Sequence, residues 1–251
     1  MLKLIIDIET IPDQTPNAVE LIAKDLVVKA PALNKQPLID ALELGDKGKY
    51  KNIDELKAMW VEKFGESEKE NQAKAKWLKT SFDGAKGQIC CICISTLTGG
   101  VVKIVGTEVE ILNQLNDYII KLVGGVFITR SKMVNLVHDG VYFIGHNSIK
   151  FDLPFLHKRY VINKIKPLFN LIAHGRHGQN CFDTMVEWVG YGERISMNNL
   201  AKALGAQGKT EGMDGSQVFP EYEKGNIQKI ADYCADDVDC TKEIYKRLTF
   251  Q

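Results

Sequence analysis

Three short stretches, far apart in the chain, carry side chains that can bind hard metal cations. They are residues 7–10 (DIET), residues 147–152 (NSIKFD) and residues 233–237 (YCADD). Carboxylate oxygens are the ligands that Mg²⁺ and Mn²⁺ prefer. The chain therefore offers a candidate set of four carboxylates and one phenol for metal-assisted chemistry, namely Asp7, Glu9, Asp152, Asp237 and Tyr233.

The first pair, Asp7 and Glu9, ends an apolar segment that reads as a buried strand over residues 2–9. Residues two apart in a strand point to the same side of the sheet, so the two carboxylates can bind one cation or bridge two. A bound divalent ion also explains why two like charges lie together. A chance D-x-E triplet is the alternative, and the place of the pair at the end of the strand favours the metal site.

Asp152 follows a predicted strand over residues 141–145 and opens a predicted helix over residues 152–161. A carboxylate there can bind a metal and also stabilise the helix N-terminus. His146 and Asn147, at the end of the strand, could reach a substrate phosphate or base. A histidine satisfied within the fold is an equally good interpretation of His146.

Tyr233 and Asp237 are four residues apart in a predicted helix that begins after Asn226 and runs to about Leu248. Residues with this spacing share one face of a helix. Packing alone explains a tyrosine beside an apolar stripe, but a partly buried aspartate needs a partner. We therefore interpret the pair as part of the same site.

The elements that must position these residues alternate between strands and helices. Further strands are predicted at residues 88–97, 101–105 and 181–182, and further helices at 107–123, after a Thr107–Glu110 capping box, and at 196–205. This order predicts an α/β domain with a mixed β-sheet flanked by helices.

Residues 13–83 interrupt this order after the first strand. They are rich in Lys and Glu, and helix starts are predicted at Thr15-Pro16, at Asn52 with Glu55 and at Ser67 with Glu70. We predict a mostly helical insertion with a solvated face, and docking of a protein partner through it is a further hypothesis.

Bulk composition is that of an ordinary globular protein, with 45% hydrophobic residues, 25% charged residues and no formal net charge. No apolar run approaches the roughly 20 residues of a membrane span, so we expect no membrane partner and a cytoplasmic location. The six cysteines offer one C-x-x-C spacing, Cys90 to Cys93, with no second such pair, which favours reduced core cysteines over disulfides or a zinc site. Residues 150–180 concentrate basic side chains, which we interpret as a phosphate-binding track, with a solvated loop as the competing interpretation.

Together the three stretches resemble the Exo I, Exo II and Exo III motifs of the DEDD exonuclease superfamily, in its tyrosine-bearing DEDDy branch. The pattern is D-x-E at Asp7 and Glu9, N-x-x-x-F-D ending at Asp152, and Y-x-x-x-D ending at Asp237. The chain is most similar to the exonucleases related to the proofreading domain of family B DNA polymerases. The resemblance implies a ribonuclease H-like fold and one exonuclease domain over 1–251, with its core at 1–12 and 84–251.

This resemblance implies two-metal hydrolysis of phosphodiesters from the 3′ end of a nucleic acid. The four carboxylates would hold two Mg²⁺ or Mn²⁺ ions, and Tyr233 would orient the attacking water. By the same resemblance, Thr10 and Ile11 would contact the terminal nucleotide, and Phe151 would pack beneath the site or against the substrate. Single-stranded DNA or a frayed 3′ end, cleaved to nucleoside monophosphates, is the favoured substrate.

Two alternatives stay open. An RNA-trimming exonuclease of the same branch would use the same motifs, because the metals act on the phosphate and not on the sugar. A catalytically silent module that binds nucleic acid or protein on a nuclease fold is a hypothesis of another class. The presence of all four carboxylates and the tyrosine favours the enzyme.

Overall fold

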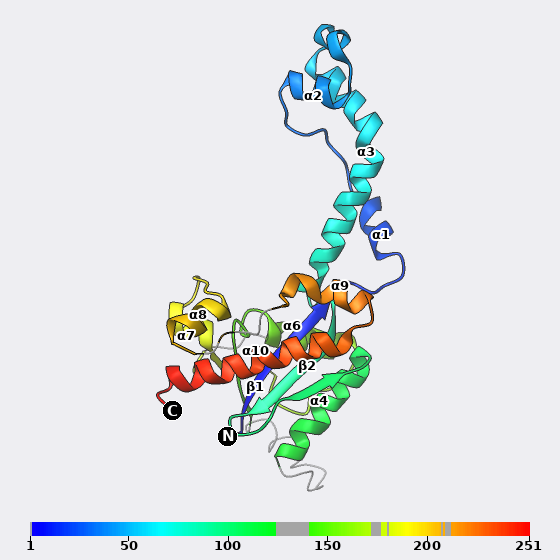
Figure 1. Ribbon diagram of the computed structural model, residues 1–251. Helices are drawn as coiled ribbons and strands as arrows, with labels where there is room; N and C mark the ends of the chain where they lie inside the picture. The colour runs from blue at the N-terminus through cyan, green and yellow to red at the C-terminus, as the bar shows by residue number, and fades with distance from the viewer. Residues whose placement is uncertain (1, 124–140, 172–176, 180, 207, 209–211) are drawn as a thin grey trace. The chain divides into compact units, whose positions relative to one another are not determined.

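The computed structural model describes residues 2–123, 141–171, 177–179, 181–206, 208 and 212–251. The chain forms two compact units (Figure 1). The core unit comprises Met1–Pro12 and Ser81–Gln251, and the inserted unit comprises Asp13–Thr80. Among the described residues, no helix combines the length and the apolarity that crossing a membrane requires.

A mixed five-stranded sheet forms the centre of the core unit, in the order β3-β2-β1-β4-β5. The strands are β1 (Leu2–Ile11), β2 (Gln88–Thr96), β3 (Val102–Val105), β4 (Val141–Gly145) and β5 (Cys181–Asp183). β1 pairs with β2 antiparallel and with β4 parallel, and β4 pairs with β5 parallel. The expected mixed sheet is confirmed, with β1 at its centre.

Helices cover both faces of this sheet. Leu4, Ile6 and Ile8 of β1 pack into one apolar core with α4 (Glu108–Leu122) and α6 (Asp152–Ile162). Ile5 and Ile11 pack into a second core with α9 (Val218–Glu223) and α10 (Ile227–Leu248). Two shorter helices, α7 (Thr184–Val189) and α8 (Met197–Ala203), follow β5. Because β1 is buried on both faces, its apolar residues are almost continuous and the two acids stand out.

Local sequence signals account for most of these boundaries. The Thr107–Glu110 capping box begins α4, and the Ser196 hydroxyl accepts a hydrogen bond from the Asn199 backbone N–H at the start of α8. Asn226 precedes α10, but its side chain donates to Glu221 and does not cap the helix. The expected strands and helices of the core unit are confirmed to within a few residues.

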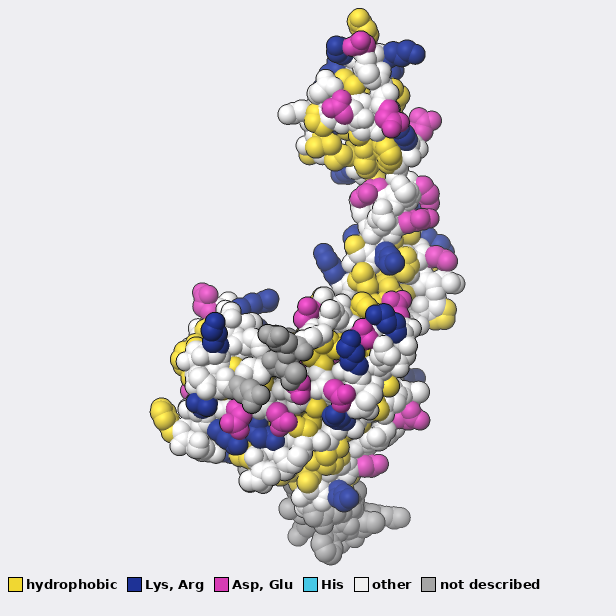
Figure 2. Space-filling view, viewed as in Figure 1, with side chains coloured by type: hydrophobic (Ala, Val, Ile, Leu, Met, Phe, Trp, Pro, Cys, Tyr) yellow, Lys and Arg dark blue, Asp and Glu magenta, His cyan; other side chains and the backbone are white. Residues whose placement is uncertain are grey.

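The inserted unit is helical. It contains α1 (Ala18–Lys24), α2 (Lys35–Ala41), two 3₁₀ turns (Gly45–Tyr50 and Lys79–Phe82, the second ending in the core unit) and α3 (Ile53–Leu78). Leu38, Ile39, Leu42 and Leu56 form its small buried core. The Asn52–Glu55 capping box begins α3 as expected. The third predicted start, at Ser67, is wrong, because α3 continues through it and the Ser67 hydroxyl donates to the Phe64 carbonyl oxygen. Figure 2 shows apolar side chains on the surface around α2 and α3.

Candidate active site

Three separate elements bring the predicted carboxylates to one cavity of about 640 Å³ in the core unit. Asp7 and Glu9 come from β1, Asp152 from the first turn of α6, and Asp237 from the middle of α10. The described residues that line the cavity are Asp7, Ile8, Glu9, Thr10, Ser81, Phe82, His146, Asn147, Phe151, Asp152, Met185, Arg194, Ile195, Ser196, Met197, Gly215, Ser216 and Asp237.

The carboxylates are held close together. An oxygen of Asp7, an oxygen of Glu9 and the Cys234 sulfur all lie within 4.8 Å of one another. Asp152 Oδ1 accepts a hydrogen bond from the backbone N–H of Ile8, at 3.2 Å, so α6 is tied directly to the strand between the two acids. Asp152 and Asp237 are each only 5% exposed. Carboxylates this buried and this close must either take up protons or bind a positive partner.

Burial and mutual repulsion raise the pKa values of two of these groups. Burial raises the pKa of Asp7 well above its ordinary value, and the charges of Asp152, Asp237 and Glu9 raise it further. Burial raises the pKa of Asp152 to about 7, against the hydrogen bonds from backbone N–H groups that lower it. A hard divalent cation removes this repulsion, and oxygen donors are the ligands it takes. The donor set therefore fits Mg²⁺ or Mn²⁺.

The turn between β4 and α6 positions Asp152, and Asp183 organises this turn. The buried Asp183 carboxylate accepts hydrogen bonds from the backbone N–H groups of Asn147 and Ile149, at 2.9 and 3.0 Å. Asn147 has φ 61°, a left-handed conformation that asparagine tolerates better than most residues. Gly145 packs so closely that a Cβ there would lie 2.5 Å from Ser148 Cβ. The turn thus needs these residues for its shape, whatever they contact in a substrate.

A β-bulge adjusts β1 at the site. The register between β1 and β2 shifts between Glu9 and Thr10, where Cys91 pairs with Glu9 and Ile89 with Thr10. The Cys90 thiol donates to the carbonyl oxygen of Glu9 at 3.4 Å. Bulges bend a strand and redirect its side chains. Here the bulge lies directly beside the D-x-E pair.

His146 lines the cavity but is held by the protein through both ring nitrogens. Nε2 donates to the Ile195 carbonyl oxygen at 3.0 Å, and Nδ1 lies 2.9 Å from the Thr184 hydroxyl. Of the two interpretations of His146, the structure supports a histidine satisfied within the fold. It braces the loop before α8 against the end of β4.

Other predicted residues take different places. Thr10 lines the cavity, and its hydroxyl donates to the Ser81 carbonyl oxygen at 2.7 Å. Ile11 is 1% exposed in the core beneath α9 and α10, and Tyr233 packs partly buried against the same core. Neither is among the described residues that line the cavity. Their contacts with a nucleotide or a water stay predictions.

Several cavity residues are missing from the sequence prediction. Phe82 is 73% exposed, and its ring centroid lies 6.4 Å from that of Phe151. Arg194 and Ser196 come from the loop before α8. Nothing in a single sequence marks Phe82, which follows the inserted unit, except that an aromatic residue stands in a polar turn.

The interpretation of residues 150–180 as a basic track is wrong for Arg159. Its guanidinium is 6% exposed and forms a buried ion pair with Glu108 at 2.7 Å. Lys158 is exposed and pairs with Asp83. Arg176 lies outside the described residues. The arginine that does line the cavity, Arg194, lies outside that stretch.

Comparison with known proteins bears on this geometry. Residues 131–251 match the model of a family described as predicted 3′–5′ exonucleases related to the exonuclease domain of PolB. The matched range contains the N-x-x-x-F-D stretch that ends at Asp152 and the Tyr233–Asp237 stretch. Over residues 131–251 the chain is therefore similar to predicted 3′–5′ exonucleases of the PolB-related family. None of the curated protein sequences compared with the chain matches it significantly.

A solved structure supports the fold of this chain. The family B DNA polymerase from the hyperthermophilic archaeon Pyrobaculum calidifontis matches with a TM-score of 0.52 and 11% sequence identity. The match covers 100% of this chain and 25% of the polymerase chain. The chain thus spans about a quarter of the polymerase's length. At this identity the likeness concerns the fold, which is the expected ribonuclease H-like α/β arrangement.

Proposed function

We propose that the core unit is a metal-dependent exonuclease that removes nucleoside monophosphates from the 3′ end of single-stranded DNA. The observation that carries the proposal is the convergence of Asp7, Glu9, Asp152 and Asp237, from three elements, on one cavity. The match to a 3′–5′ exonuclease family supports the polarity of cleavage. We further propose that residues 13–80 are an insertion in this single exonuclease domain.

The four carboxylates would hold two Mg²⁺ or Mn²⁺ ions. When bound, such ions activate a water and stabilise the leaving 3′ oxygen. Asp152, fixed by the Ile8 N–H, keeps its carboxylate in place before any ligand arrives. Tyr233, one helical turn before Asp237, would orient the attacking water. A phenol with an ordinary pKa near 10 positions a water better than it removes a proton at neutral pH.

The cavity also contains side chains that could bind one or two nucleotides. Phe82 presents an exposed ring beside Phe151, and aromatic rings bind bases of any sequence by stacking. Arg194 and Ser196 would contact the backbone phosphates of the same strand. The chain has no net charge, so binding would rest on these local contacts and on the metals. A double helix would first have to fray for a base to reach Phe82.

A direct assay tests this proposal. The purified protein is incubated with 5′-labelled single-stranded DNA and with RNA of the same sequence, in Mn²⁺ and in EDTA, beside Asp7→Ala. We expect a ladder that shortens from the 3′ end in Mn²⁺, and no cleavage in EDTA or by the variant. The ratio of the two rates decides between DNA and RNA, because only RNA carries the 2′-hydroxyl.

Two results would contradict the proposal. Cleavage that survives thorough chelation would exclude a metal-dependent mechanism. No cleavage of either strand with any divalent ion, by a folded protein that still binds single strands, would favour a binding module on the nuclease fold.

A further inference from the structure

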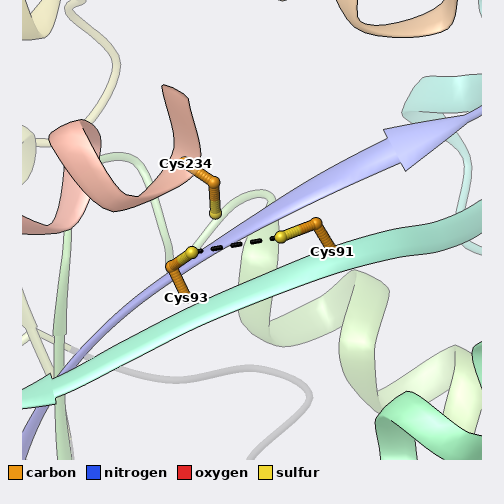
Figure 3. Close-up of side chains that lie close together, drawn as sticks. All are labelled: Cys91, Cys93 and Cys234. Atoms are coloured by element: carbon orange, nitrogen blue, oxygen red, sulfur yellow. Dashed lines mark hydrogen bonds between the residues drawn. The ribbon is translucent and has the colours of Figure 1, made fainter. Parts of the chain in front are cut away.

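Three buried cysteines lie beside the carboxylate cluster. Cys91 and Cys93 come from β2 and Cys234 from α10. All three are free thiols with 0% exposure. Figure 3 shows the Cys234 side chain pointing from the helix toward the two thiols on the strand. Their spacing in the sequence hides this cluster, because the third cysteine comes more than a hundred residues later.

The spacing of the three sulfurs is that of a metal-binding cluster. The Sγ atoms of Cys91 and Cys93 lie 3.9 Å apart, and all three sulfurs lie within 4.8 Å of one another. In a tetrahedral site with Zn–S bonds of about 2.3 Å, neighbouring sulfurs lie about 3.8 Å apart. The thiols are thus arranged for one cation to reach all of them with small side-chain movements.

An oxygen donor adjoins the cluster at Cys234. The Cys234 thiol donates to Asp7 Oδ2 at 3.3 Å, and the Cys93 thiol donates to the Ala231 carbonyl oxygen at 3.4 Å. Asp7 also lines the cavity, so this carboxylate lies between the thiols and the candidate active site. Three sulfurs and one oxygen are a ligand set for a soft or borderline cation and not for Mg²⁺.

We propose that Cys91, Cys93 and Cys234 bind one thiophilic cation of the Zn²⁺ or Cd²⁺ class, with Asp7 as the fourth ligand. The three thiols lose their protons to solvent when the cation binds. The binding itself does not depend on the proposed exonuclease function. Its consequence for cleavage does, because the cation would withdraw Asp7 from the carboxylate cluster and inhibit the nuclease.

Cadmium provides a readout that is independent of activity. Cd²⁺ is titrated into the full-length protein in the presence of excess Mg²⁺, and the ultraviolet sulfur-to-cadmium charge-transfer absorption is recorded. We expect the absorption to saturate at one Cd²⁺ per chain. Cys91→Ala and Cys93→Ala should each weaken Cd²⁺ binding by at least about tenfold, the scale on which altered ligand shells act. The melting temperature of each apo variant shows whether it folds, and that of the wild type should rise with Cd²⁺.

Matched variants separate this site from its neighbours. Cys240→Ala removes a buried thiol of the same helix that packs in another apolar cluster, and it should leave the absorption unchanged. Asp237→Asn alters the carboxylate cluster but none of the sulfur ligands, and it should also keep the absorption. In the wild type, Cd²⁺ should lower the rate of 3′-end cleavage at constant Mg²⁺, and Cys93→Ala should relieve this inhibition.

A wild-type protein that shows no saturable sulfur-to-cadmium absorption would overturn the proposal and leave the thiols as core packing. So would absorption that persists unchanged in the folded Cys91→Ala and Cys93→Ala variants. If the protein cleaves no nucleic acid but shows the absorption, the cation site stands and the proposed nuclease function fails. If it cleaves and Cd²⁺ binds through sulfur without inhibition, the role of Asp7 as a shared ligand is wrong.

Discussion

The Asp7 carboxylate has three acidic neighbours and one thiol neighbour, and their balance sets what this part of the molecule can bind. Asp152, Asp237 and Glu9 repel its negative charge, whereas the Cys234 thiol donates a hydrogen bond to it. The protein therefore stabilises an ionised Asp7 poorly by itself. A cation at this point supplies the missing positive charge.

Asp237→Asn tests the cluster with little change of shape. Loss of one metal-binding charge should lower kcat/KM for 3′-end cleavage on the order of a hundredfold or more, as when one electrostatic group is removed from an active site. Asp239→Asn is the control, because Asp239 is 63% exposed on the same helix and pairs with Lys242. Equal rates for Asp237→Asn and the wild type would remove Asp237 from the site.

Tyr233→Phe removes only the phenol oxygen. If Tyr233 orients the attacking water, kcat should fall while KM and the Mn²⁺ concentration for half-maximal activity stay unchanged. Steady-state kinetics at several Mn²⁺ concentrations measure all three quantities. A variant that needs much more Mn²⁺ would show that the tyrosine acts on metal binding instead.

Sequence patterns predict the acids of the site better than its supports. Asp7, Glu9, Asp152 and Asp237 stand out because carboxylates are rarely found on the buried parts of strands and helices. Asp183 caps α7 by accepting hydrogen bonds from the Met185 and Val186 N–H groups. Its bonds to the turn before α6 could not be foreseen, because they depend on the parallel pairing of β4 and β5.

At the scale of elements, one buried ion pair fixes α6 in the core unit. The Arg159 guanidinium is bonded to both carboxylate oxygens of Glu108, at 2.8 and 2.7 Å, and to the Gly84 carbonyl oxygen. Glu108 also accepts from the backbone N–H of Ile89. The pair thus joins α4, α6 and the segment that leads into β2. Since α6 carries Asp152, this contact helps to position the site.

Arg159→Met should lower the free energy of unfolding by about 3–5 kcal/mol, because it leaves Glu108 buried without its charge partner. Lys158→Met is the matched control on the same helix. Its pair with Asp83 is about half exposed on both sides, so the loss should stay below about 1 kcal/mol. Urea denaturation of both variants measures the difference. Similar losses for the two would mean that Arg159 contributes little beyond a surface pair.

Glu221 in α9 is hydrogen-bonded to residues at the start of α10, and this makes the stability of the fold depend on pH. Hydrogen bonds from Asn226, Lys224 and Lys229 lower the pKa of Glu221 from 4.5 to about 2. A group whose pKa is lowered on folding stabilises the protein above its ordinary pKa. This contribution is lost as the pH falls from about 4.5 to about 2.

Glu221→Gln should therefore be less stable than the wild type above pH 4.5, with the difference shrinking as the pH falls through this window. Urea midpoints of both proteins across the window measure it. A difference that is constant with pH would mean that the charge of Glu221 does not contribute to folding.

Periodicity and capping predict the strands and longer helices of the core unit, but not the short helices α7 and α9 or the irregularities of the strands. Alternation in β2 places Cys91 and Cys93 on one side and Cys90 on the other. The bulge beside Glu9 instead brings Cys90 into the same apolar cluster as the other two. A bulge depends on the partner strand, which no local pattern contains. The local pattern at Ser67 also resembles a helix start, although α3 continues through this residue.

At the scale of the whole molecule, the two segments of the core unit that flank residues 13–80 are hydrogen-bonded to each other. The Thr10 hydroxyl bonds to the Ser81 carbonyl oxygen at 2.7 Å, and both residues belong to the core unit. The residues that flank the inserted unit are thus joined by a hydrogen bond within the core unit. Docking of a protein partner by the inserted unit stays a prediction.

Replacing residues 13–80 by a short Gly/Ser linker should leave a folded core unit that still cleaves the 3′ end of single-stranded DNA. The full chain and the shortened chain are compared by circular dichroism, by melting temperature and by kcat/KM on the same oligonucleotide. A folded but inactive shortened protein would show that the inserted unit takes part in the reaction. Loss of folding would show that the two units depend on each other for stability.

The central position of β1 in the sheet has a consequence for folding during synthesis on the ribosome. Leu2 pairs with Val141, and Asp237 reaches the site only from α10. At roughly 5–20 residues per second, a ribosome needs on the order of ten seconds to make the chain between β1 and β4. During that time β1, an apolar strand, lacks its parallel neighbour. The carboxylate cluster also stays incomplete until α10 is made, so the proposed nuclease activity can arise only after the whole core unit has been synthesised.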